Sequence, residues 1–527
     1  MSLSQRIAMS KAGIHAIPAA APRPASLRLG LATALLLGGC AVGPDFQSPQ
    51  PPAAASGNTY TPTPVAPETV SAPGPGGASQ RLLAGQDIPA QWWSLFHSDA
   101  LDQLIRAALV QSPNLAAAQA ALRQAQETLR AQTGALQYPN VGLQLGAQRE
   151  RANTYTSAGV ADFNLYNASV NVSYTLDLFG GNRRALEGLA AAVDYQRFQV
   201  EAAHLALTSN LVTTAIREAS LRAQLQATRE VLALQEKQLS VVDVQFNAGA
   251  VARSAVLTQR TQVTQTRATI PPLEKALAQT RHQLSVYAGK LPSELGLPEF
   301  QLDSLQLPQE LPVTLPSSLV RQRPDIRASE ALLHQASAQV GVATAAQYPQ
   351  LNLSASYGTS AFEASQLFTP ASVLWSLAAG LTLPIFNGGA LSAKKRAAVA
   401  AYDQAQAQYQ ATVLGAFQNV ADALRAIESD AEALSAQAQA EALAREALTL
   451  TNDQYKLGAV SYLQLLDAQR TYQQTRISLV QAQAARYADT AALFQALGGW
   501  WNAPALADAS RPSTTAVMER PALAPVR

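Results

Sequence analysis

The sequence predicts a mainly helical protein with a small β part, built from two similar halves that follow one another along the chain. Three observations lead to this fold class. Short motifs recur in the same order about 210 residues apart. Each half contains two stretches in which apolar and polar residues alternate, which is the period of a β-strand. Each half also contains a segment of more than roughly 60 residues without helix breakers.

The composition narrows the classes of partner. The chain has 38 basic and 36 acidic residues among 527, and a net charge of +2 does not favour binding to nucleic acid. Only 14% of the residues are charged and 48% are hydrophobic. Beyond residue 40, however, no apolar run approaches the roughly 18 to 20 residues that a spanning helix needs. The sequence therefore excludes a polytopic helical membrane protein.

The first 39 residues have the layout of a secretory signal peptide. Residues 29–39 (LGLATALLLGG) are apolar, and the four basic residues before them are not accompanied by any acidic residue. Cys40, the only cysteine, resembles the acylated cysteine of a bacterial lipobox. It is followed by Ala41 and not by aspartate, which by resemblance to lipoprotein sorting rules indicates the outer membrane. Removal of residues 1–39 brings the net charge to 2 − 4 = −2.

Residues 40–90 are expected to form a lipidated, proline-rich N-terminal tether. The stretch Pro44–Gly77 is dense in Pro, Ala, Ser, Thr and Gly and almost lacks large apolar residues, a composition typical of extended chain. Gly74, Gly76 and Gly77 follow no predicted strand and open no helix. They are therefore interpreted as linker glycines and not as a phosphate-binding loop.

The internal repeat is carried by four pairs of landmarks that keep their order. The pairs are SPNL at 112–115 with RPDI at 323–326, QYPN at 137–140 with QYPQ at 347–350, LDLFGG at 176–181 with LPIFNG at 383–388, and QFNAGAV at 245–251 with QYKLGAV at 454–460. They predict a first repeat over 91–290 and a second over 319–500. A proline-rich, irregular linker over 291–318 separates the two, and an Ala/Pro-rich flexible tail over 501–527 follows.

Alternation predicts two strands in each repeat. Residues 141–147 and 161–179 alternate in the first repeat, with a long polar connection between them, and residues 351–357 and 375–385 alternate in the second. Ordinary hairpins on a soluble core are the alternative, but a lipid anchor favours strands that cross a membrane. Because four strands cannot close a barrel, closure needs other copies. Two copies supply eight strands around a packed interior, and three supply twelve around a lumen.

The remaining residues of each repeat predict long helices. Residues 183–246 and 390–455 are rich in Ala, Gln, Leu and Arg and almost free of proline, and each would extend roughly 95 Å. A turn follows each segment, at 247–253 or 456–461, and then a shorter returning helix. Each repeat is therefore expected to be a strand hairpin from which a long antiparallel helical hairpin hangs.

Together these landmarks resemble the TolC-like outer-membrane factors, specifically the NodT-type lipoprotein channels of resistance-nodulation-division (RND) efflux systems. The resemblance rests on CAVGPDF at 40–46, WWSLF at 92–96, RPDI at 323–326 and the two GAV turns, and it covers nearly the whole mature chain. It implies a homotrimer in which a twelve-stranded outer-membrane β-barrel continues into a trimeric periplasmic α-barrel, girdled at the 291–318 linker.

The resemblance also implies a function and partners. The chain would be the lipid-anchored outer-membrane channel of a tripartite efflux pump, with a large periplasmic extension. It would act as a passive exit duct for small molecules, which an inner-membrane RND transporter passes on through a periplasmic adaptor.

Two kinds of site are implied as well. In the family an acidic residue on the long helix of the second repeat lines a constriction near the periplasmic tips, and the matching motif here is NVADALR at 419–425. Asp422 would then recur around the threefold axis, and Arg425 would tie the ring shut through charge-assisted hydrogen bonds. An i,i+3 pair on a solvated helix face is the alternative reading of the same two residues.

The two GAV turns match family tips that meet the hairpins of the adaptor. The turn residues are Gly249, Ala250, Val251, Gly458, Ala459 and Val460. Glycine suits a tight reversal whether or not a partner binds there. We expect these residues both to turn the chain and to dock the adaptor.

Nothing in the sequence predicts an enzyme, a cofactor or a metal site. The histidines His97, His204, His282 and His334 are scattered without ligand spacing, and no nucleophile motif appears. Two alternatives to the efflux channel remain open. One is the outer-membrane conduit of a type I secretion system, which the lipobox and the motifs disfavour. The other is a non-conducting coiled-coil lipoprotein that spans the periplasm, which would not need half-apolar hairpins.

Overall fold

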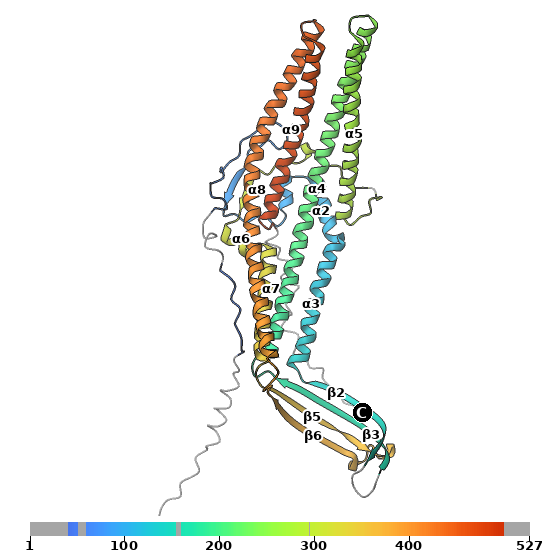
Figure 1. Cartoon of the computed structure of the whole chain (residues 1–527), viewed down its shortest axis with the longest axis vertical. Helices are drawn as coiled ribbons and strands as arrows, with labels where there is room; N and C mark the ends of the chain where they lie inside the picture. The colour runs from blue at the N-terminus through green and yellow to red at the C-terminus, as the bar shows by residue number, and fades with distance from the viewer. Residues whose placement is uncertain (1–40, 51–58, 154–159, 295, 500–527) are drawn as a thin grey trace, which may run out of the picture.

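The chain forms an elongated body with a small sheet at one end and the turns of two helical hairpins at the other (Figure 1). The computed structural model describes residues 41–50, 59–153, 160–294 and 296–499. The predicted signal peptide, Cys40 and the predicted tail over 501–527 lie outside the described residues.

Two pairs of helices of equal length build most of the body. Helices α4 (Gly181–Asn247) and α8 (Ala390–Lys456) have 67 residues each, and α5 (Arg253–Tyr287) and α9 (Tyr462–Ala496) have 35 each. The offset along the chain from α4 to α8 is the same as that from α5 to α9, and we call it the repeat offset. The two long helices end within two residues of the bounds that the sequence predicts. Among the described residues, no helix combines the length and apolarity required to cross a membrane.

Shorter helices pack beside the halves of α4 and α8 that are nearer the sheet (Figure 1). They are α2 (Asp99–Gln111), α3 (Pro113–Gln137), α6 (Pro316–Gln322) and α7 (Pro324–Ala345). The landmark pair SPNL and RPDI marks the starts of α3 and α7, where Pro113 and Pro324 occupy the first helical turn. Proline is favoured there because its missing N–H has no intrahelical partner to lose.

The sheet has four antiparallel strands in the order β2-β3-β5-β6. The strands are β2 (Asn140–Asn153), β3 (Val160–Leu176), β5 (Gln350–Ala361) and β6 (Val373–Thr382). The predicted polar connection after residue 148 is shorter than expected, because β2 continues to Asn153. The last strand ends at Thr382 and not at residue 385, since Pro384 has no N–H for a strand ladder.

The strand register separates an apolar face from a polar face. Leu143, Val170, Tyr357 and Trp375 are aligned across the four strands. We call this set the apolar row; its members are 71%, 41%, 63% and 75% exposed. The next row lies on the opposite face, and we call it the polar row; it consists of Gly142, Asn171, Ser356 and Ser376. The alternation in the sequence therefore becomes one apolar face that solvent reaches and one polar face.

A belt of short elements and irregular segments lies beside the middle of the body (Figure 1). Strand β1 (Arg81–Ala84) pairs in parallel with β4 (Glu310–Val313), and the 3-10 helices η2 (Trp92–Phe96) and η3 (Leu302–Ser304) lie beside them. Trp92 is fully buried. The WWSLF landmark is therefore part of the main hydrophobic core, together with apolar residues from the 291–318 linker such as Phe300.

The described part of the predicted tether is extended but packs against the helices. Strand β1 lies within the 40–90 segment. Gly76, expected to be a linker glycine, has φ +73°, and a Cβ there would lie 3.2 Å from the ring of Tyr487. A few close contacts thus fix a segment whose composition contains almost no large apolar residues.

Candidate functional site

Two equivalent turns form the end of the body that is farthest from the sheet (Figure 1). The N–H of each turn glycine donates to the carbonyl three residues earlier, at 2.9 Å for Gly249 and 3.0 Å for Gly458. The N–H groups of Ala250 and Ala459 donate to the carbonyls five residues earlier, at 2.8 and 2.9 Å. Both glycines have positive φ, +72° and +73°, which other residues rarely adopt. Because the long helices extend about 100 Å, these turns lie far from the strands.

The turn residues are available to a partner. Gly249, Ala250, Gly458 and Ala459 are exposed, and Val251 and Val460 are half-buried. No side chain lies within 4 Å of the position that a Cβ would take on either glycine. The structure therefore brings each set of predicted tip residues together at the end of a rod.

Polar side chains link the two hairpins near these turns. Tyr455 on α8 donates to the side-chain oxygen of Gln245 on α4 at 3.0 Å, and Tyr462 on α9 donates to Gln259 on α5. The rings of the two tyrosines lie 5.9 Å apart. Burial, with a smaller contribution from Tyr455, raises the pKa of Tyr462 far above its ordinary value, so the hydroxyl remains a donor. These bonds hold the ends of the hairpins together within one chain.

Asp422 and Arg425 do not lie near the turns, contrary to the sequence expectation. Asp422 lies almost midway between Ala390 and Lys456, the first and last residues of α8. Arg425 donates to Glu428 at 2.6 Å and to the carbonyl of Thr63 at 2.5 Å. The placement at the tips was wrong because similarity between short motifs does not measure distance along a helix. Arg425 instead fastens the N-terminal segment to the middle of α8.

Another Asp-x-x-Arg pair, Asp467 with Arg470, does lie near a turn. Asp467 and Arg470 are exposed on α9, and Asp467 comes shortly after Tyr462, with which that helix begins. Asp467 also lines a hollow of about 500 Å³ between α8 and α9. The sequence contained the signal that distinguishes the two pairs, since Asp467 follows closely on Val460 of the GAV turn.

An exposed apolar stripe runs along each long helix near the turns. Leu443, Leu450 and Leu457 are 67%, 56% and 84% exposed and recur every seven residues along the end of α8. Leu234 and Val241 on α4 are the counterparts of Leu443 and Leu450 by the repeat offset and are 55% and 42% exposed. A seven-residue spacing keeps side chains on one face of a helix. Both hairpins therefore carry an equivalent uncovered stripe, which the heptad spacing in the sequence indicates.

A buried arginine joins three segments at mid-height. Arg486 on α9 is 1% exposed and donates to the carbonyls of Ile427 at 2.9 Å and Ala78 at 3.2 Å. Burial lowers its pKa. Burial also raises the pKa of Asp489 to about 7, helped by a hydrogen bond and charge repulsion from Asp430 and opposed by the charge of Arg486. This cluster connects the N-terminal segment to α8 and α9.

The described histidines lie on different elements of the body. Within the ranges 41–50, 59–153, 160–294 and 296–499, no three residues of the types His, Cys, Asp and Glu gather in a group that could hold a metal ion. His204 is buried, and this burial lowers its pKa to about 4. Its neutral form fits a side chain packed between helices.

Comparison with known proteins decides the family. The family model described as outer membrane efflux protein matches the chain twice, over residues 104–290 and 315–499. The chain belongs to the outer membrane efflux protein family. Members are outer-membrane channels of efflux systems and not enzymes, so this protein is an efflux channel of the bacterial outer membrane.

Curated relatives match this efflux protein over most of their length. The pyoverdine export outer membrane protein OpmQ of Pseudomonas putida is 32% identical over 84% of this chain and 95% of its own. The cation efflux system protein CusC of Escherichia coli is 30% identical over 89% and 98%. The probable outer membrane lipoprotein SilC of Salmonella typhimurium is 29% identical over 90% and 98%.

Solved structures match the fold of this efflux protein. The outer-membrane channel OprN superposes with a TM-score of 0.78 at 26% identity, covering 88% of this chain and 100% of OprN. A crystal structure of CusC gives 0.75 at 27% identity, covering 87% and 99%. The mainly helical architecture with a small sheet is therefore that of known outer-membrane channels.

Proposed function

We propose that three copies of this chain close a twelve-stranded barrel in the outer membrane, continued by a helical barrel in the periplasm. The trimer is the passive exit duct of a tripartite pump. It receives small molecules from an inner-membrane RND transporter through a periplasmic adaptor, and Cys40 carries the acyl chains that anchor each copy. The observation that carries this proposal is the four-stranded sheet with one exposed apolar face.

The sheet supports closure by other copies. Among the described residues, β2 and β6 each pair on one side only, so two edges are open. Open strand edges are not tolerated in hydrocarbon, because their N–H and C=O groups have no partner there. The apolar row faces outward on such a barrel and the polar row lines its interior. Twelve strands leave room for a lumen, whereas eight are filled by side chains.

The helices support closure in the same way. Helix α4 packs against both α5 and α9 of its own chain. The equivalent neighbours of α8, by the repeat offset, are α9 and α5, yet in the described chain α8 makes no comparable contact with α5. A ring of copies supplies that contact, with α8 of one copy beside α5 of the next. The same ring buries the first half of α8, most of which is exposed in the single chain.

The constriction of this duct lies near the turns, and we assign Asp467 and Arg470 to it in place of Asp422 and Arg425. Three exposed carboxylates brought close to one axis favour cations and repel one another. Arg470 is one helical turn away and is able to pair with them. The support for this assignment is the position of the pair near the start of α9.

The tip residues and the apolar stripes beside them are the docking surface for the adaptor. The Gly and Ala residues of both GAV turns are exposed at the end of the body, as a partner arriving from the inner membrane requires. The stripes offer an apolar surface to helical hairpins of the adaptor, which bind grooves through residues at heptad-like spacing.

Crosslinking of the strand edges tests the trimer. Gly142 on β2 and Gly380 on β6 have open space where a Cβ would lie. Within one chain their strands are three spacings of about 4.8 Å apart, too far for a short bis-maleimide. We expect the double variant Gly142→Cys/Gly380→Cys, treated in outer membranes, to give a covalent ladder that ends at three copies. Each single variant is the control, and a ladder that ends at two or continues past three contradicts the proposal.

A further inference from the structure

The first described residues of the chain pack closely against α4 and α7 where the sheet meets the helices, and we call this contact surface the groove. The N–H of Val42 donates to the carbonyl of Phe179 at 3.0 Å, between the end of β3 and the start of α4. The ring of Phe46 stacks on His334 of α7, with centroids 4.3 Å apart and planes at 12°. This short segment is therefore held at both of its ends.

Glycines in this groove allow backbone to approach backbone closely. A Cβ on Gly43 would lie 2.6 Å from the Cα of Gly341 in α7, and a Cβ on Gly180 would lie 2.5 Å from the Cα of Ala41. Real Cβ atoms do not come so close to backbone, so neither position accepts another residue without movement. Gly43 and Gly180 also have positive φ, +100° and +78°.

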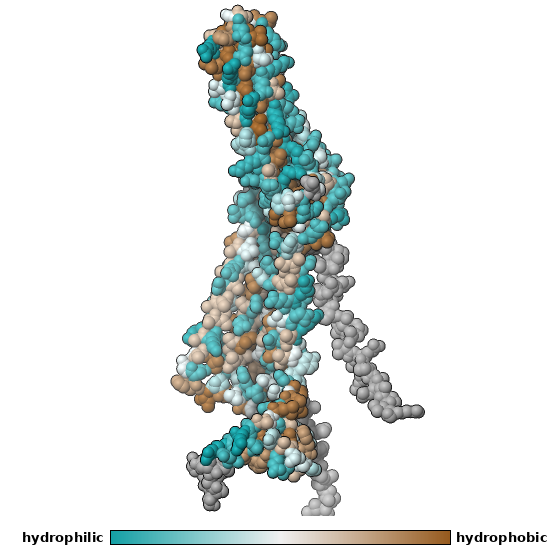
Figure 2. Space-filling view, turned by 90° about the vertical axis from the view of Figure 1, so that its right-hand side faces the viewer, coloured by the Kyte–Doolittle hydropathy of each residue, from teal (hydrophilic) through white to brown (hydrophobic). Residues whose placement is uncertain are grey.

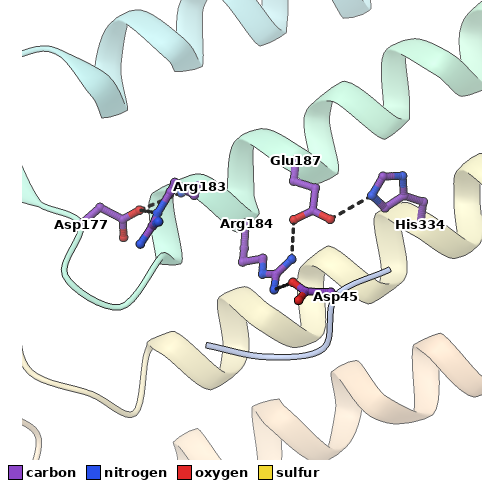
Figure 3. Close-up of polar contacts among 6 residues, drawn as sticks. All are labelled: Asp45, Asp177, Arg183, Arg184, Glu187 and His334. Atoms are coloured by element: carbon purple, nitrogen blue, oxygen red, sulfur yellow. Dashed lines mark hydrogen bonds and ion pairs between the residues drawn. The ribbon is translucent and has the colours of Figure 1, made fainter. Parts of the chain in front are cut away.

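A chain of polar contacts runs from Asp45 through Arg184 and Glu187 to His334, as Figure 3 shows. Arg184 on α4 is 5% exposed and donates to Asp45 at 2.5 Å and to Glu187 at 2.7 Å. The other oxygen of Glu187 lies 2.9 Å from Nε2 of His334. Burial acts to raise the pKa of Glu187, but hydrogen bonds with Arg184 and His334 outweigh it and lower that pKa. The carboxylate therefore stays ionised between its two partners.

The groove lies at the boundary between the sheet and the helices. Strand β3 ends at Leu176 and α4 begins at Gly181, so Phe179 lies at the boundary between sheet and helices. Ala41 lies against Gly180 at this boundary. Ala41 directly follows Cys40 in the sequence, so the groove holds the residue next to the proposed acylation site at this boundary.

We propose that Gly180, Arg184, His334 and Gly341 form an anchor groove for residues 41–46, which sets the acylated Cys40 level with the ends of the membrane strands. The inference rests on the proposed acylation and the proposed barrel. Its consequence is that the lipid anchor is held at a fixed position relative to the helices and strands. The acyl chains and the strands of each copy enter the membrane at one height, so a docked segment helps the strands of three copies meet in register.

Chymotrypsin tests docking, because it cuts after Phe46 only when the segment leaves the groove. We expect Gly43→Ala to speed cleavage at Phe46 on the order of tenfold, since cleavage follows the open fraction. Gly296→Ala is the matched control: its φ is +103°, and a Cβ there meets nothing within 4 Å. Asp45→Asn should speed cleavage by a smaller factor, because Asp45 is exposed. Unchanged cleavage in both groove variants overturns the docking.

An insertion tests the role in setting height. Ala-Gly-Ser-Gly placed directly after Cys40 keeps an alanine beside the cysteine but separates the anchor from the groove, whereas the same insertion after Gln50 leaves both in place. We expect the first to lower the yield of edge-crosslinked trimers several-fold and the second to leave it unchanged. Equal yields from both variants contradict the inference.

The readouts keep this inference separate from the proposed function. Mass spectrometry of the N-terminal peptide checks that Cys40 is acylated in every variant. If Cys40 is not acylated, or if the Gly142→Cys/Gly380→Cys protein without an insertion gives no crosslinked trimer, the proposed function is contradicted. The chymotrypsin result decides docking in either case.

Discussion

Asp489 is the residue at which pH should act on stability most visibly. Its pKa is raised from 3.8 to about 7 in the folded chain by burial and by Asp430, with Arg486 opposing. Between these values the folded state holds a proton that the unfolded state has lost. Stability from this group is therefore full below about pH 4 and falls as the pH rises towards 7, after which it stays level.

Asparagine at this position imitates the protonated carboxyl. We expect Asp489→Asn to raise the melting temperature at pH 8 and to leave it nearly unchanged at pH 4, because only the ionised carboxylate carries the burial cost. Circular dichroism at 222 nm in detergent measures both. A shift of the same size at both pH values would show that packing, and not the charge, is responsible.

Single residues should also determine the cation preference at the proposed constriction. We expect Asp467→Ala to reduce the cation preference of the channel and Asp422→Ala to change it much less, because only Asp467 lies near the narrow end of the proposed duct. Reversal potentials across a salt gradient in planar bilayers measure the preference. A larger effect of Asp422→Ala than of Asp467→Ala would place the constriction at the middle of α8 and contradict the assignment.

Residues differ in how much of their role the sequence reveals. The turns at Gly249 and Gly458 were predictable, since a glycine that ends a long helical pattern carries a local signal. The contact of Arg184 with Asp45 spans 139 positions in the sequence. Only the folded backbone brings such residues together, and the same holds for Arg425 and Thr63.

Among the elements, the strands are the ones proposed to cross the membrane, with their apolar face towards lipid. Leu145 and Gln144 are neighbours on β2 that point to opposite faces of the sheet, and Leu145 is 71% exposed on the apolar face. Arginine on a lipid-facing strand costs about 2–4 kcal/mol at the bilayer centre, and less near its surfaces. We expect Leu145→Arg to reduce edge-crosslinked trimers in outer membranes and Gln144→Arg to leave them near the unmodified level. Equal loss in both would contradict the assignment of faces.

The helical hairpins make a separate prediction about partners. We expect a photoreactive crosslinker on Ala250→Cys or Ala459→Cys to capture the periplasmic adaptor in cells, because both positions are exposed at the turns. Ala116 on α3 is equally exposed but lies far from the turns, so Ala116→Cys is the control. Capture from Ala116 alone would place the docking surface elsewhere.

Helices and strands were predictable to different degrees. The two long helices agree with the sequence to within two residues, because 67 residues without a breaker leave no competing structure. The strand ends were harder to predict, since polar residues of β2 continue the ladder to Asn153, where the cross-strand pair of Arg151 with Asp162 replaces apolar alternation. The packing of residues 59–84 against the belt depends on a few contacts, such as Gln80 with Thr490, which composition does not reveal.

At the scale of the whole molecule, apolar and polar surface are distributed along the length of the body. Figure 2 shows pale to brown residues over much of the lower half of the helical body, next to the strands, and more polar residues around mid-height. Exposed apolar side chains thus include two sets: the apolar row of the sheet and the stripes near the turns. This distribution fits a protein that stands in one membrane and extends into water.

Ion conductance of the purified, acylated protein in planar lipid bilayers separates a duct from a spacer. We predict discrete conductance steps that appear only with crosslinkable trimers and disappear when Leu145→Arg prevents their assembly. Trimers that insert into the bilayer but give no steps, in every salt and at every voltage that the membrane tolerates, would contradict the channel and support a non-conducting lipoprotein that spans the periplasm.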